Sequence, residues 1–411
     1  MAEEPTNRGD WAEEYVRDFL SLPLISEFVF HSVQTNDVTQ KEVADFLIHY
    51  PGVGVLISQK TQQDPFSRDT ARNASWVLKK TCDAVSQLRG ALREPKRLMW
   101  CKHPRRGRVD LPEGLPPISH GLVLTETFNA VDLNPQATDL PLEYKGAAIT
   151  YLSLNDFLHL AQELRTVPEI LAYLDARRSL PFKDLRTIGD ERALLEFYYL
   201  QEGSLAGCVG KADAAVVVAA RQPDLSRALR AKWDHDQYSH LIEHVAAQLS
   251  TRRKDYAAGL SEEDAARYDD PENRKGYLRL QAVLADLRLR ERAEIGQAFS
   301  ETMERRQAAD TFMYKATHVD TRPEWVYVLG SSAGLDPQEL ENRKHRLLIG
   351  AAAFYRKNNC LLIIDRNNGT SYEVGLVSSP TPPSSPIERA LGNELFGHLK
   401  MTDKPLNLIP Q

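Results

Sequence analysis

The sequence contains little cysteine, and its cysteines are scattered. Its 411 residues include 4 cysteines, and none are spaced as C-x-x-C. Zinc ribbons and disulfide-rich secreted domains need grouped cysteines, so the sequence argues against both classes. The thiols are predicted to be reduced, as in a cytoplasmic protein.

Long apolar runs are also absent from the sequence. No stretch approaches the roughly 20 consecutive apolar residues that span a bilayer, and the acidic start of the chain lacks the apolar core of a signal peptide. The sequence therefore predicts a cytoplasmic protein without membrane contact.

The chain has no overall excess of positive charge. Its net charge is −6, so any nucleic-acid-binding surface must be local. Basic residues concentrate between positions 60 and 108, and the stretch 102–108 is expected to form a loop. The candidate phosphate contacts are Lys79, Lys80, Arg89, Lys102, Arg105, Arg106 and Arg108. The alternative is that these side chains form ordinary solvated faces.

Apolar periodicity predicts three regions and an α/β (α+β) fold. Residues 1–150 are expected to form a mixed sheet flanked by helices, and residues 151–310 to be mostly helical. Residues 311–411 are expected to form a small α/β domain with a Pro/Ser-rich linker and a tail. The charges of the long helix expected from residue 274 to about 307 suit a solvent-bridging helix or a dimer seam. The middle region is expected to provide dimerisation, substrate clamping or contact with a partner protein. In the first helix, the stripe Trp11, Tyr15 and Phe19 is expected to be core.

One stretch, residues 42–60, reads as a β-hairpin whose turn is Pro51 and Gly52. Counting outward from this turn, Asp45 faces Ser58, and Lys60 shares their face. An acid and a lysine therefore meet at one end of a strand pair. A carboxylate there suits Mg²⁺ or Mn²⁺, and a lysine suits charge stabilisation on a phosphate. The alternative is an ordinary hairpin with a surface salt bridge.

An acidic strand, a turn, a strand ending in Ser-x-Lys, a basic helix and a further strand follow one another in this part of the chain. The pattern resembles the PD-(D/E)xK (restriction-endonuclease-like, Mrr-like) nuclease superfamily over the N-terminal third. The resemblance implies that Asp45 binds the metal, that Lys60 is the catalytic lysine and that Gln87 is an active-site glutamine. It further implies a metal-dependent DNA endonuclease, as in bacterial restriction or anti-phage defence.

The sequence departs from that superfamily at Ser58, where an acid or glutamine is usual. The missing charge is expected from Glu42, or from Glu13 or Glu14 on the first helix. If no second acid reaches the site, the alternative is a non-catalytic nucleic-acid-binding or scaffold protein on the same fold.

A third hypothesis comes from the motif H-x-x-E-H at His240, Glu243 and His244. Its histidines lie one helical turn apart, so they could share a zinc ion with Glu243 as the base of a peptidase. The alternative is a polar helix face.

Overall fold

The structure is a computed structural model. It describes residues 8–38, 40–62, 69–104, 106–127, 131–133, 139–259, 271–309, 312–332, 336–366 and 369–397. The chain divides into two compact units, Met1–Ala228 and Leu229–Gln411, and each is described by itself. The expected boundaries were residues 150 and 310. A strand crosses residue 150, whereas a helix ends at Ala309, so residue 310 falls between two elements of the second unit.

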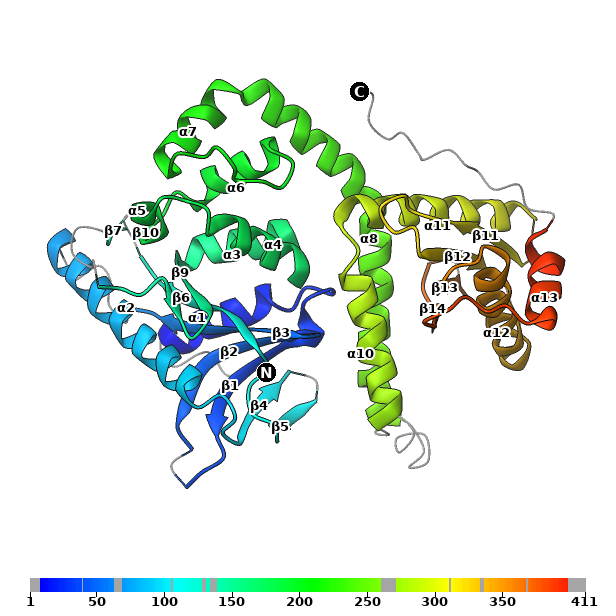
Figure 1. Ribbon diagram of the computed structural model, residues 1–411, viewed down its shortest axis with the longest axis horizontal. Helices are drawn as coiled ribbons and strands as arrows, with labels where there is room; N and C mark the ends of the chain where they lie inside the picture. The colour runs from blue at the N-terminus through cyan, green and yellow to red at the C-terminus, as the bar shows by residue number, and fades with distance from the viewer. Residues whose placement is uncertain are drawn as a thin grey trace. The chain divides into compact units, whose positions relative to one another are not determined.

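The first unit is built on an eight-stranded sheet with the order β5-β4-β1-β2-β3-β6-β9-β8 (Figure 1). Strand β3 pairs antiparallel with β2 and parallel with β6, and β6 pairs parallel with β9. The strands are β1 (Val29–Thr35), β2 (Glu42–Tyr50), β3 (Val53–Lys60), β4 (Met99–His103), β5 (Gly107–Leu111), β6 (Ile118–Thr125), β8 (Glu143–Tyr144) and β9 (Ala147–Ser153). A small separate pair joins β7 (Val131–Asp132) to β10 (Thr187–Ile188).

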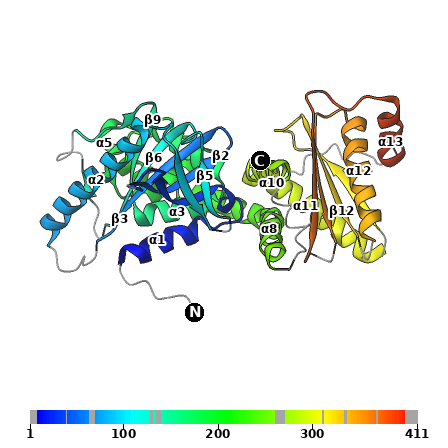
Figure 2. The same cartoon turned by 90° about the horizontal axis from the view of Figure 1, so that it is seen from below.

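Helices cover both faces of this sheet. Helix α2 packs on one face through an apolar stripe that includes Val77, Ala84 and Leu88, while α1 and α3 contact each other on the other side (Figures 1 and 2). The helices are α1 (Arg8–Phe19), the short 3-10 turn η1 (Ser26–Phe28), α2 (Thr70–Arg93), α3 (Leu154–Leu164), α4 (Val167–Arg177), α5 (Phe182–Leu185), α6 (Glu191–Leu200), α7 (Lys211–Ala220) and the start of α8 (Gln222–Gly259).

The second unit contains a four-stranded sheet with the order β11-β12-β13-β14, in which β12 and β13 are parallel and α12 connects them. Helix α11 contacts β11 and β12. The further elements are α10 (Pro271–Ala285), α11 (Leu289–Ala309), β11 (Met313–Thr317), β12 (Trp325–Ser331), α12 (Pro337–Phe354), β13 (Asn359–Asp365), β14 (Tyr372–Ser378) and α13 (Pro386–Phe396). The predicted fold class, mixed α/β with a helical middle region, is confirmed.

The prediction that the aromatic stripe of α1 is core was wrong. Trp11 is 43% exposed and Tyr15 is 39% exposed, whereas the buried residues of α1 are Ala12 and Val16. The helical period produces both stripes, and the one with the smaller side chains lets α1 approach the sheet closely.

The basic stretch 102–108 was expected to be a loop, but most of it is paired. Lys102 lies in β4 and Arg108 in β5, and these two residues face each other in an antiparallel hairpin. The apolar residues Met99, Cys101 and Leu111 of this hairpin are buried, because one face of it continues the core of the sheet.

No described helix has both the length and the apolar composition required for a membrane span.

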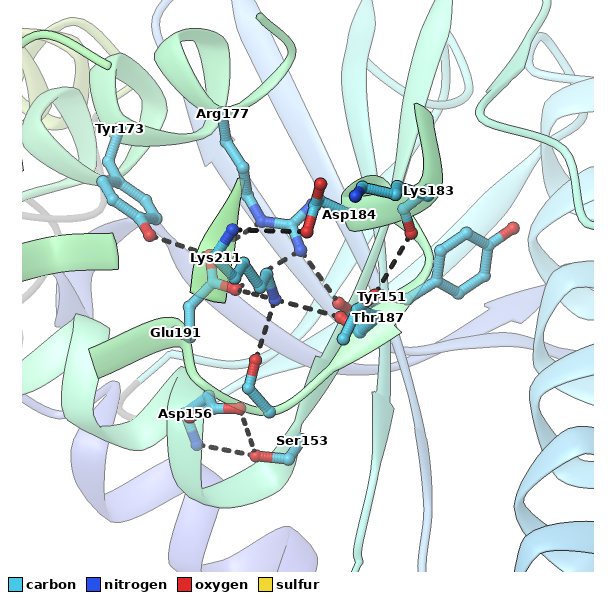
Figure 3. Close-up of polar contacts among 11 residues, drawn as sticks. Tyr151, Ser153, Asp156, Tyr173, Arg177, Lys183, Asp184, Thr187, Glu191 and Lys211 are labelled. Carbon is cyan, nitrogen blue, oxygen red and sulfur yellow. Dashed lines mark hydrogen bonds and ion pairs between the residues drawn. The ribbon is translucent and has the colours of Figure 1, made fainter. Parts of the chain in front are cut away.

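A buried cluster of charges fastens the helices α4, α6 and α7 to the sheet (Figure 3). The Glu191 carboxylate accepts hydrogen bonds from Arg177 Nε at 2.7 Å, Lys211 Nζ at 2.6 Å and the Tyr173 hydroxyl at 2.8 Å. Arg177 also donates to the backbone carbonyl of Tyr151 on β9. These four clustered side chains (Glu191, Arg177, Lys211 and Tyr173) are at most 2% exposed, so the cluster is structural.

Glu191→Gln is expected to destabilise the first unit by about 3–5 kcal/mol, because it leaves two cations buried without a counter-charge. Urea denaturation measures this loss. Glu196→Gln on the same helix is the control, since it breaks only the pair with the exposed Arg192 and should cost at most about 1 kcal/mol. Equal losses in the two variants would contradict the prediction.

The cluster also predicts how stability depends on pH. Burial raises the pKa of Glu191, but Arg177 and Lys211 outweigh it and lower the pKa to about 2. The stabilisation is therefore complete above the unfolded pKa of about 4.3 and is lost as pH falls towards 2. Thermal unfolding between pH 5 and 2 should show this decline in the wild type, and Glu191→Gln should lack that component of it.

Candidate functional site

The hairpin of β2 and β3 brings Asp45 and Lys60 together. Its observed register runs from Tyr50 opposite Val53 to Phe46 opposite Ile57, so the register predicted from the Pro-Gly turn is confirmed. Asp45 Oδ2 accepts a hydrogen bond from the backbone N–H of Gln59 at 2.5 Å and lies 3.7 Å from Lys60 Nζ. The acid and the lysine therefore meet at the end of β3.

Helix α2 contributes Gln87 to the same place. Its amide oxygen accepts hydrogen bonds from Lys60 Nζ and from Ser58 Oγ, each at 3.0 Å. Ser58 is fully buried, so its hydroxyl is committed to Gln87. The contacts bring four of the predicted site residues together: Asp45, Ser58, Lys60 and Gln87.

The charge of Asp45 acts on two further acids, Glu13 and Glu42. Glu42 begins β2 and Glu13 lies on α1; both residues are exposed. Desolvation of the carboxyl group, then the charges of Asp45 and Glu42, raise the pKa of Glu13 to about 7. The pKa of Glu42 is raised by the same two kinds of effect, desolvation and the Asp45 charge, while Lys60 and Lys102 oppose the rise.

Asp45 thus acts on Glu13, one of the two α1 acids that the sequence offered. Glu14 is exposed and points about 100° further round the helix. The sequence alone could not choose between Glu13 and Glu14, because the choice depends on the orientation of helix α1.

Sequence reasoning missed one ion pair beside the site. Glu126 follows the end of β6, and its backbone N–H donates to the carbonyl of Lys60 at 3.0 Å. Its carboxylate accepts two hydrogen bonds from Arg8, at 2.6 and 3.2 Å. This pair anchors α1 next to Lys60. An acid directly after a parallel strand was the available signal, because ligands often bind at the carboxyl ends of such strands.

The oxygen atoms of the site match only some of the ligands that a hard divalent cation needs. Oδ2 of Asp45 is engaged, and its Oδ1 has no hydrogen-bond partner among the described residues. Mutually repelling carboxylates are typical of cation sites. However, across the described ranges no three His, Cys, Asp or Glu side chains form a group that could hold a metal ion.

The predicted basic residues fall on two elements, α2 and the β4–β5 hairpin. Lys79 and Lys102 are exposed, and Lys80 pairs with Asp83 at 3.0 Å. Two arginines lie over aromatic rings, Arg89 over Tyr144 and Arg108 over Trp100. Arg105 lies outside the described residues.

Arg106 was predicted to contact phosphate, but in the structure its side chain contacts other parts of the protein. The side chain is half-buried, donates to the backbone carbonyl of Glu27 at 2.7 Å and lies over the ring of Phe30. A run of basic residues in a sequence does not show which of their side chains pack inside the protein and which remain available for phosphate.

The H-x-x-E-H residues lie on α8, in the second unit. His240 Nδ1 lies 3.4 Å from Glu243 Oε2, so Glu243 pairs with a histidine of its own motif. His244 contacts Gln248 at 3.1 Å and the ring of Tyr372 edge-on. The described part of this unit supplies no third ligand.

Comparisons with protein-family models, with curated proteins and with solved structures found no match to this chain.

Asp45→Asn is expected to lower the pKa of Glu13 below its value of about 7, because one of the charges that raises it is removed. The amide oxygen introduced can still accept the Gln59 N–H, so the hairpin should persist. Carboxyl ¹³C shifts in glutamate-labelled protein follow the titration. Asp83→Asn on α2 is the control, and an unchanged Glu13 pKa in Asp45→Asn would show that the two carboxylates do not interact.

Proposed function

We propose that the first unit is a metal-dependent DNA endonuclease that hydrolyses phosphodiester bonds at Asp45 and Lys60. The observation that carries the proposal is the close approach of this acid and this lysine, 3.7 Å apart, with the lysine ammonium held by the amide oxygen of Gln87. An acid and a lysine held together at the end of a strand suit phosphoryl chemistry, which uses both charges.

The order of elements supports the same proposal. Helix α1, the antiparallel strands β1 to β3, helix α2 and strand β4 follow one another, which is the order expected from the resemblance to PD-(D/E)xK nucleases. Strand β4 pairs with β1, and the strand parallel to β3 is β6, which follows the β4–β5 hairpin. Asp45 stands on the second of these strands and Lys60 at the end of the third, as that resemblance implies.

Each side chain has a chemical task in this proposal. Asp45 and Glu42, with water completing the coordination, would hold Mg²⁺ or Mn²⁺, which when bound polarises the scissile phosphodiester. Lys60 stabilises the negative charge that develops on the phosphate, or orients the attacking water. Gln87 fixes the Lys60 ammonium, and Ser58 fixes Gln87.

One observation favours the alternative of a non-catalytic nucleic-acid-binding protein. Ser58 adds no charge where the superfamily usually has an acid, and the described residues form no group of three metal-ligating side chains. In that case Asp45 and Lys60 would be a structural pair, and the basic residues of α2 and β4 would bind phosphate.

Lys60→Ala is expected to reduce cleavage of supercoiled plasmid or single-stranded DNA at least about 100-fold, because it removes the charge that stabilises the transition state. Cleavage is measured with Mg²⁺ or Mn²⁺ at saturating DNA. Lys183→Ala, an exposed lysine of α5, is the matched control and should cut like the wild type.

The outcome separates the two candidates. Metal-dependent cutting that is lost in Lys60→Ala supports the nuclease. Salt-sensitive DNA binding without cutting by the wild type in either metal would favour the non-catalytic alternative, and equal cutting by wild type and Lys60→Ala would contradict the proposed site.

A further inference from the structure

Helix α1 presents a ladder of aromatic rings to solvent. The Trp11 and Tyr15 rings are stacked, with centroids 5.1 Å apart and an angle of 13° between planes, and Tyr15 meets Phe19 edge-on at 5.1 Å. Trp11 and Tyr15 are about two-fifths exposed. Exposed rings in a contiguous row are uncommon on a surface without a binding role.

An acidic row runs beside this ladder. Asp10, Glu14 and Asp18 are exposed, and each directly precedes one of the rings in sequence. Their spacing of four residues places them in a row on one side of the helix. The exposed face of α1 therefore consists of two parallel rows, one aromatic and one acidic.

These two rows argue against two kinds of occupant. Surfaces that stack unpaired bases combine aromatic rings with positive charge, and here the neighbouring row would repel phosphates. A second copy of α1 in a symmetric pair would bring acidic rows against each other, and like charges across an interface cost affinity.

We propose that this face of α1 docks a partner protein through a basic amphipathic helix. Aliphatic side chains of the partner would cover the rings, and a row of Lys or Arg would lie over the acids and the ring edges. Trp and Tyr often carry most of the energy of such contacts, and cations bind well to their faces. The two rows match a helix with one apolar and one basic row.

The docking surface adjoins the candidate site through the helix itself. Arg8 of α1 holds Glu126, whose backbone contacts Lys60, and Glu13 of α1 responds to Asp45. A helix docked on α1 would therefore lie at the border of that site. The proposal does not depend on nuclease activity, because it is tested by binding alone.

The test uses the full chain and two synthetic amphipathic helices. One carries leucine on one face and lysine on the other (the Lys/Leu peptide), and its counterpart carries glutamate in place of lysine (the Glu/Leu peptide). Calorimetry should detect binding of the Lys/Leu peptide and none of the Glu/Leu peptide. Trp11→Ala should weaken that binding about 30-fold, as expected for a central aromatic contact.

A charge swap makes the test specific. The double substitution Glu14→Lys and Asp18→Lys changes only exposed side chains and should transfer preference to the Glu/Leu peptide. Asp213→Lys, an exposed acid on α7, is the control and should leave the preference unchanged. No binding of the Lys/Leu peptide to the folded wild type, or a preference unaffected by the swap, would overturn the proposal. Tighter binding of single-stranded DNA that depends on Trp11 would overturn it in favour of a nucleic-acid surface.

Discussion

The register of the β2–β3 hairpin is the constraint on which the candidate site depends. Side chains alternate along a strand, so a slip of one residue would turn Asp45 and Lys60 to opposite faces. The tight turn sets this register, because Gly52 adopts a φ of +78° that other residues rarely reach. Strand β3 is held on its other side by β6. The position of Lys60 is thus fixed from both neighbours.

Perturbed ionisation alone does not distinguish the proposed site from the buried cluster around Glu191. Glu191 has a pKa lowered to about 2, and shifted carboxylates often mark functional sites. However, its oxygens are satisfied by three buried donors, and a substrate has no access to it. At the Asp45 site the pKa of Glu13 is shifted by a similar amount, to about 7, but Glu13 and Glu42 are exposed and Lys60 is half-buried. Solvent access, rather than the size of the pKa shift, therefore distinguishes the two clusters.

The sequence predicted the register of the β2–β3 hairpin better than it predicted the surfaces. Turn chemistry and strand alternation are local, and they sufficed to place Asp45 beside Lys60. The choice between Glu13 and Glu14 depends on how α1 rotates on the sheet, which a helical period does not determine. Arg106 was predicted to contact phosphate because it stands in a basic run. Its actual partners, Glu27 and Phe30, lie far away in sequence, so the sequence did not reveal them. The pair of Arg8 and Glu126 was missed for the same reason.

Helix α1 shows how one short element can serve several surfaces. Its small residues Ala12 and Val16 are buried, so the large side chains are left for other directions. Glu13 lies on one side of this buried stripe, towards Asp45 and Glu42. The rings of Trp11, Tyr15 and Phe19 lie on the other side. Arg8 also fastens the helix to Glu126, whose backbone N–H donates to the carbonyl of Lys60. A partner docked on the outer face of α1 would therefore shift the equilibrium of the proposed site only by binding one position of this helix better than another.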